Sequence, residues 1–318
     1  MNQDMTQYEK HMQALNSFAE RVKKAPNVIA MLLFGSLAYG TVGRKSDIGI
    51  TLIVRDGSIA NERGFSADED GIYISCHGLR EVSKFKKDLQ ELRGDGYEHA
   101  LLGSGKLVFS KDEALVALHE ATRKIGDDDA PRAFAAKISG LYNWMWKAEK
   151  HITLIDDPLY AQRFIQLSAA IVAEMELIRH RENPNREAIR RAQELNPKLM
   201  HELYTIPSTT IMSVEDVRHA LNILDEYLME HMEWWSRHIL RTLSDGEPKL
   251  CGWWGAVTYL EEKGVIQRTT IPRRVFKNSK LTVDEVAYVY IKAYSGETGA
   301  AKQQAARPVC EAYEREEK

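Results

Sequence analysis

Two short apolar runs lie close together near the start of the chain. Residues 28–34 are VIAMLLF and residues 48–54 are IGITLIV, the second of which is rich in β-branched side chains. Runs of this length and composition are typical of buried strands. The first run ends in Gly35-Ser36, and two further glycines interrupt the segment between the runs, so only a brief helix fits there. The sequence therefore predicts two buried strands joined by a glycine-rich turn.

The segments on either side of these strands extend the same folding unit. Apolar side chains recur at helical spacing over residues 5–24, which predicts an amphipathic helix before the first strand. After the second strand we expect a polar loop, a third strand over 72–76, a helix over 80–93 and a fourth strand over 107–109. Strands and helices in this order predict an α/β domain with a mixed sheet over residues 1–110.

The rest of the chain has a different character. Long amphipathic helices predict a helical bundle over 111–240. Beyond it, a helix ending near Leu243, a compact helix over 253–263 and a strand–turn–strand in GVIQRTTIPRRVFKN resemble a winged helix, a helix-turn-helix variant closed by a hairpin. We expect that module over 241–295 and a charged tail over 296–318.

Charge and cysteine content exclude several classes of protein. The 318 residues carry 43 Lys and Arg against 46 Asp and Glu, a formal net charge of −3, so any nucleic-acid contact must be local. Cys76, Cys251 and Cys310 lie far apart and show no metal-ligand spacing. No apolar run is long enough to cross a bilayer, and the first residues lack the pattern of a secretion signal. We expect a soluble, cytoplasmic protein without a membrane partner.

The turn between the first two strands carries residues suited to phosphate chemistry. Gly35 lets the backbone come close to a triphosphate, and the Ser36 hydroxyl can donate to phosphate oxygens. Because successive strand residues face opposite sides, Ile48, Ile50 and Leu52 are expected in the core. Asp47, Gly49 and Thr51 then face the site.

Gly-Ser, a later Gly and Ser-Asp-Ile opening a strand together resemble the nucleotidyltransferase superfamily, including its antibiotic-modifying and minimal members. The resemblance covers residues 28–110 and implies Mg²⁺-dependent transfer of a nucleotidyl group from a nucleoside triphosphate to a hydroxyl of a small-molecule acceptor. It implies a catalytic, metal-binding role for Asp47 and nucleotide contacts from Gly35, Ser36, Gly40 and Ser46. Arg44 and Lys45 either steer the triphosphate or are solvated loop charges.

The sequence departs from the superfamily pattern at the second metal-binding carboxylate. Gly49 stands where the family has Asp, and a glycine offers no ligand. The outward positions of the third strand, Tyr73, Ser75 and His77, are not acidic, although a shifted register could bring in Asp70. The site is thus impaired or uses other ligands. The alternative is a catalytically inactive relative that binds nucleotide, or a winged-helix DNA-binding regulator.

Three further features admit two interpretations each. His77 is a metal ligand or a surface residue, and Glu174 and Glu176 on the helix over 160–181 either supply a base to the acceptor or lie on a solvated face. The hairpin over 267–280 carries a basic patch that suits weak, non-specific nucleic-acid binding, or it only packs, with Trp254 and Leu260 of the preceding helix buried. That patch consists of Arg268, Arg273, Arg274, Lys277 and Lys280.

Overall fold

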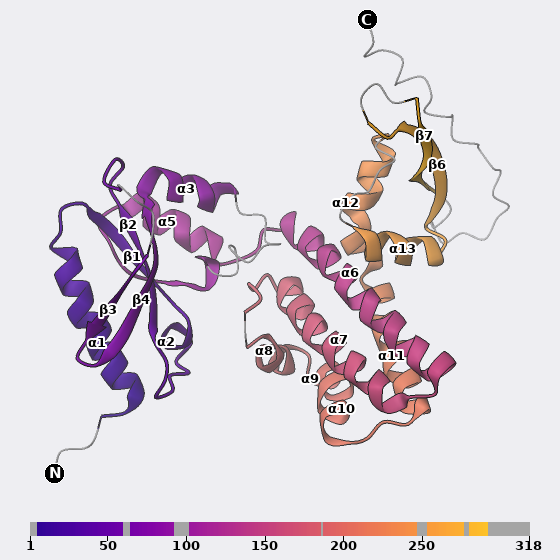
Figure 1. The fold of residues 1–318 in the computed structure, drawn as a ribbon, viewed down its shortest axis with the longest axis horizontal. Coiled ribbons are helices and arrows are strands. Elements are labelled where there is room, and N and C mark those ends of the chain that lie inside the picture. The colour runs from indigo at the N-terminus through magenta and orange to yellow at the C-terminus, as the bar shows by residue number, and fades with distance from the viewer. Residues whose placement is uncertain are drawn as a thin grey trace, which may run out of the picture. The chain divides into compact units, whose positions relative to one another are not determined.

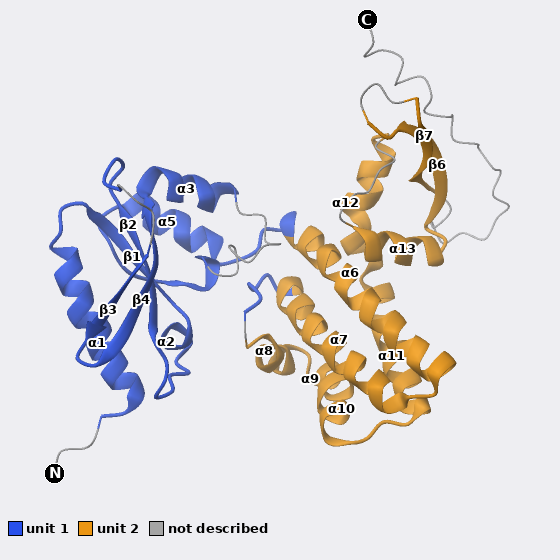
Figure 2. Cartoon of the chain, in the orientation of Figure 1, with its two compact units in different colours: residues 1–129, 180–186 blue, residues 130–179, 187–318 orange. Residues whose placement is uncertain are grey.

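The structure, a computed structural model, describes residues 5–59, 64–91, 102–185, 187–246, 253–276 and 280–291. It divides into two compact units (Figure 2). Unit 1 comprises residues 1–129 and 180–186, and unit 2 comprises residues 130–179 and 187–318.

Unit 1 is built on a five-stranded mixed sheet with the strand order β3-β4-β2-β1-β5 (Figure 1). Among its strand pairs, β2 and β4 run parallel and the others run antiparallel. The predicted mixed α/β fold is confirmed. Its elements are α1 (Gln7–Lys23), β1 (Val28–Phe34), α2 (Ser36–Tyr39), β2 (Ile48–Val54), β3 (Phe65–Glu69), β4 (Ile72–Glu81), α3 (Val82–Glu91), β5 (Lys106–Ser110) and α5 (Glu113–Thr122).

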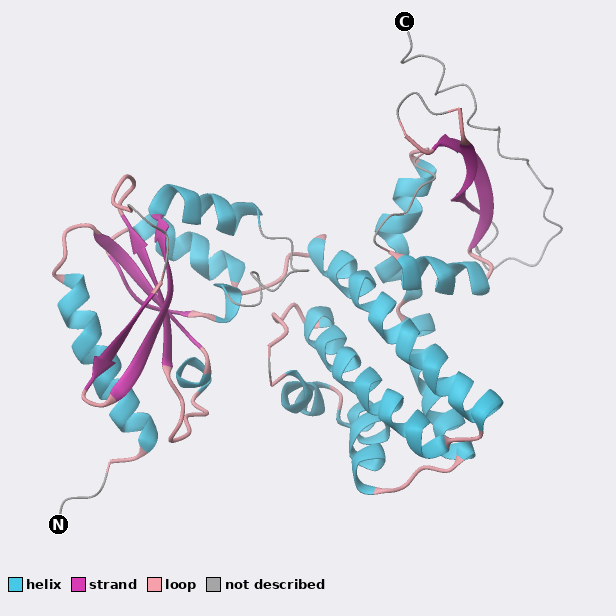
Figure 3. Ribbon diagram, in the orientation of Figure 1, coloured by secondary structure: helices cyan, strands magenta, loops and turns pink. Residues whose placement is uncertain are grey.

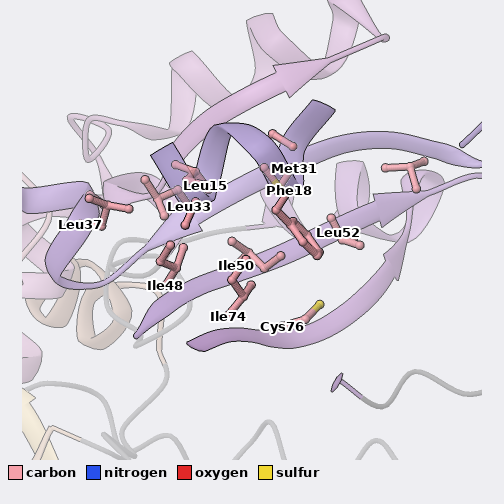
Figure 4. Packing of buried hydrophobic residues seen from close by; sticks show 14 of the residues in the cluster. Leu15, Phe18, Met31, Leu33, Leu37, Ile48, Ile50, Leu52, Ile74 and Cys76 are labelled. Atoms are coloured by element: carbon pink, nitrogen blue, oxygen red, sulfur yellow. The ribbon is translucent and has the colours of Figure 1, made fainter. Parts of the chain in front are cut away.

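Both faces of the sheet are covered, but by different helices. A capping box between Thr6 and Glu9 begins α1, and Leu15 and Phe18 of this helix then pack on one face (Figure 4). Ile48, Ile50 and Leu52 lie in this same core with exposed fractions of 0%, 0% and 4%, as predicted. On the other face α3 and α5 pack on the sheet, and the core there contains Ala30, Leu32, Phe34, Ile53, Phe85, Leu89 and Leu115.

The prediction of a polar loop before β4 was wrong, because residues 65–69 form β3. Asp70 and Gly71, with φ of 54° and 76°, make the tight turn that pairs β3 with β4. Glu69 faces α1, where it is buried and accepts hydrogen bonds from Ser17 and Arg21. The sequence of β3, FSADE, shows little apolar alternation. This strand is therefore stabilised by its pairing with β4 and its contacts with α1.

Unit 2 is mainly helical. Among the described helices, none has the length and apolar character that crossing a membrane requires. The helices are α6 (Asp129–Lys150), η1 (His151–Ile155), α7 (Pro158–Arg179), α8 (Ala188–Leu195), α9 (Pro197–Met200), η2 (His201–Thr205), α10 (Ile206–Thr209), α11 (Val214–Glu230), α12 (Met232–Ser244) and α13 (Trp254–Glu262).

A two-stranded ribbon of β6 (Ile266–Arg274) and β7 (Thr282–Tyr290) follows α13 (Figure 3). The predicted turn within residues 264–278 was wrong, since the run up to Arg274 is one strand. Pro272 is tolerated there because each strand of a two-stranded ribbon has a free edge. Leu260 is fully buried as predicted, but Trp254 is 58% exposed, against the prediction. The winged helix itself stays a prediction.

Candidate functional site

The strand register brings the motif residues to one edge of the sheet. β1 and β2 pair antiparallel with Phe34 opposite Gly49, so the chain leaves β1 through Gly35-Ser36 beside the point where Ser46-Asp47 enters β2. The parallel pairing of Ile48 with Ile74 places the start of β4 at the same edge. In Figure 1, α2 lies at this end of the sheet together with the N-terminal end of α1.

The turn after β1 requires glycine at both of its ends. Gly35 and Gly40 have φ of 74° and 75°, and a Cβ at either position would meet no atom within 4 Å. Backbone conformation rather than space therefore demands glycine here. Ser36 begins α2 and is partly exposed, and the Tyr39 hydroxyl donates to Ser104 at 2.8 Å. The turn is held in place and presents backbone to solvent.

His77 occupies the space that a side chain at position 49 would need. Asp47 is exposed, whereas Gly49 is buried, and a Cβ on Gly49 would lie 3.0 Å from His77 Nε2 and 3.6 Å from the Phe34 carbonyl oxygen. The His77 ring also meets Phe34 edge-on, with centroids 6.5 Å apart. Between Ile50 and Leu52 the register shifts by one extra residue on β4, a bulge of the kind that re-aims side chains.

β4 and β3 carry hydroxyl groups near the start of β2. Ser75 lies opposite Gly49, and the Tyr73 hydroxyl donates to Ser66 on β3. The Asp68 carboxylate accepts a hydrogen bond from the Gly71 amide at 3.1 Å. Within the described ranges, no cluster of three or more His, Cys, Asp or Glu side chains could hold a metal ion. A two-ion site with protein carboxylates around both ions does not fit these residues.

Four of the predicted site residues gather at a separate place, which we call the α1 hollow. This half-open cavity of about 440 Å³ lies between α1, the loop over 43–46 and the β3–β4 turn. Gly35, Ser36 and Asp47 do not line it. Its lining includes Arg44, Lys45, Ser46 and Asp70, together with Lys10 and His11 of α1. No sequence pattern indicates the contribution of α1, because its residues are distant along the chain from the other lining residues.

The two glutamates of α7 are both paired within unit 2. Glu174 forms an ion pair with Lys137 at 2.5 Å. Glu176 is fully buried and accepts two hydrogen bonds from Arg179, at 3.0 and 3.1 Å, and one from the Tyr227 hydroxyl at 2.8 Å. Burial raises the pKa of Glu176, but the hydrogen bonds from Arg179 and Tyr227 outweigh it and lower the pKa. These contacts indicate a structural role for Glu176.

The basic patch of residues 267–280 is faced by acids that lie outside that segment. Arg268 pairs with Glu261 of α13 at 2.7 Å, and Arg273 pairs with Glu285 of β7. Arg274 is exposed, and Lys277 lies outside the described residues. The pairs neutralise part of the patch that the sequence predicted.

Comparison with known proteins bears on the fold. No model of a protein family matches this chain, and no curated protein matches it. Among solved structures, the chain is similar to a nucleotidyltransferase-like protein from Exiguobacterium sibiricum 255-15, with a TM-score of 0.56 and 14% sequence identity. The similarity covers 88% of this chain and 99% of that chain. At this identity it supports an α/β nucleotidyltransferase-like fold and carries no information on substrate.

Proposed function

We propose that unit 1 binds a nucleoside triphosphate at the sheet edge where Gly35-Ser36 and Ser46-Asp47 meet. The pairing of Phe34 with Gly49 is the observation that carries this proposal, because it sets the phosphate-binding type of turn beside a carboxylate. Exposed backbone at Gly35 and the Ser36 hydroxyl suit phosphate oxygens. The nucleotidyltransferase-like fold of the Exiguobacterium protein is in agreement.

The metal chemistry of this edge predicts slow turnover. Mg²⁺ is commonly held by one or two carboxylates together with substrate phosphates, so Asp47 suits one ion when a triphosphate is bound. The superfamily reaction uses two ions about 3.5–4 Å apart, and the second carboxylate position is Gly49 under the His77 ring. We therefore propose slow nucleotidyl transfer to a small hydroxyl-bearing acceptor. Nucleotide binding without turnover is the second candidate, and the placement of His77 favours it.

Titration calorimetry with ATP, GTP, CTP and UTP, with and without Mg²⁺, tests the proposal. We expect Mg²⁺ to tighten binding to the wild-type chain and Asp47→Asn to remove that effect. Ser36→Ala should weaken binding about tenfold, the value of one hydrogen bond to a charged group. Ser208→Ala, an exposed serine of unit 2, is the matched control and should bind as the wild type does. Equal affinities in all four proteins would refute the assigned site.

A further inference from the structure

The α1 hollow concentrates positive charge next to the proposed nucleotide edge. Ser46 of that edge lines the hollow, whereas Gly35, Ser36 and Asp47 do not. Lys10, Arg44 and Lys45 contribute three cations, and Asp70 contributes the one carboxylate of the lining. Neither the three cations nor Asp70 forms an ion pair with any described residue. A net excess of unpaired cations around a concave surface attracts a small anion. The hollow thus favours an anion.

A buried histidine forms part of the wall of the hollow. His11 is 2% exposed, with Nδ1 2.7 Å from the Gln7 carbonyl oxygen and Nε2 3.0 Å from the Ser46 carbonyl oxygen. The contact with the Ser46 carbonyl oxygen links α1 directly to the loop over 43–46.

The same histidine fixes the loop that carries two of the cations. The Ser46 carbonyl oxygen contacts His11. In addition, the Ser46 hydroxyl accepts a hydrogen bond from the Gly43 amide, and the Ser46 amide donates one to the Gly43 carbonyl oxygen, both at 3.0 Å. Arg44 and Lys45 therefore project from a short loop closed at both ends and anchored to α1. A site assembled before its ligand arrives loses less entropy on binding.

We propose that the α1 hollow is a binding site for a small organic phosphate that carries free hydroxyl groups. Lys10, Arg44 and Lys45 hold the phosphate, and the Asp70 carboxylate accepts hydrogen bonds from ligand hydroxyls. A volume of about 440 Å³ suits a molecule of the size of a sugar phosphate. This site lies beside the proposed triphosphate site and shares Ser46 with it, but Gly35, Ser36 and Asp47 do not line it.

Amide NMR shifts of the full chain, titrated with ribose 5-phosphate and separately with inorganic phosphate, test the proposal. We expect ribose 5-phosphate to shift the Lys10, Lys45 and Gly71 amides, and Lys10→Ser or Arg44→Ser to weaken its binding about tenfold each. Lys23→Ser, on the last turn of α1, is the matched control and should leave the affinity unchanged. Thermal melting of each variant confirms that the fold is retained.

Two further variants separate the possible outcomes. Asp70→Asn should weaken the binding of ribose 5-phosphate but not of inorganic phosphate, and Ser36→Ala should affect neither. No shift of these amides by millimolar ribose 5-phosphate, or equal losses in Lys10→Ser and Lys23→Ser, would overturn the site. Equal affinity for the two ligands, insensitive to Asp70→Asn, would overturn its assignment to an organic phosphate. Failure of triphosphate binding at Ser36 would leave all these results unaffected.

Discussion

Replacing Gly49 with Asp returns the carboxylate that the superfamily pattern has at this position, but His77 opposes the change. The new Cβ would lie 3.0 Å from His77 Nε2, closer than most Cβ contacts, so the ring must move. His77 is exposed and can swing outward, at the loss of its edge-on contact with Phe34. The restored carboxylate and the histidine are thus expected to be energetically coupled.

The magnitude of this coupling follows from the contacts. An aromatic edge contact contributes about 0.5–1.5 kcal/mol, so displacing the ring should lower the free energy of unfolding of Gly49→Asp by about 1 kcal/mol. His77→Ser loses the same contact and should cost a similar amount. Because both changes remove one contact, the double variant should cost about 1 kcal/mol rather than about 2, a coupling of about 1 kcal/mol.

Urea unfolding of the wild type, the two single variants and the double variant measures this cycle. Magnesium-dependent ATP affinity, measured on the same four proteins, should rise most in Gly49→Asp/His77→Ser, by about tenfold or more. Additive unfolding energies would show that His77 does not occupy the space at position 49. An unchanged magnesium dependence in the double variant would refute the assignment of position 49 as a missing metal ligand.

Three other outcomes are expected. Glu176→Ala should lower the free energy of unfolding by about 2 kcal/mol, because it leaves the buried Tyr227 hydroxyl and the half-buried Arg179 without their carboxylate. Glu174→Ala, in a partly exposed pair, should cost less than about 1 kcal/mol in the same urea titration. Burial lowers the pKa of His119, so this side chain binds a proton more readily in the unfolded chain than in the folded one. The free energy of unfolding should therefore fall as the pH drops below about 6.5. Thermal melting over a series of pH values should show a smaller fall in His119→Gln than in the wild type. Glu261→Gln with Glu285→Gln should strengthen weak, salt-sensitive binding of random-sequence duplex DNA severalfold in fluorescence anisotropy, and unchanged binding would exclude the ribbon as the contact surface.

Much of unit 1 could be predicted from local patterns. The apolar runs of β1 and β2 and the helical spacing of α1 and α3 are properties of single segments, and each appears in the structure within a few residues of its predicted bounds. β3 could not be predicted in this way, since it is held by its pairing with β4 and by the burial of Glu69 against α1. The full length of β6, up to Arg274, could not be predicted, because proline is typical of turns and Pro272 lies within this strand.

In the candidate site, too, some features follow from local sequence and others from long-range packing. The meeting of the Gly35-Ser36 turn with Asp47 follows from a strand–turn–strand motif, which the sequence contains in one continuous segment. The position of His77 over Gly49 depends on a bulge in β4 that no local pattern indicates. Lys10 and Arg44 are distant in the sequence, and only the packing of α1 on the sheet brings them together at the α1 hollow.

A crystal structure of the chain with a non-hydrolysable ATP analogue and Mn²⁺, with manganese located by its anomalous scattering, tests the central claim most directly. We predict the triphosphate at the Gly35-Ser36 turn and one manganese ion, bound by Asp47 and phosphate oxygens, with His77 still lying over Gly49. Two manganese ions about 3.5–4 Å apart, or a triphosphate away from that turn, would contradict it.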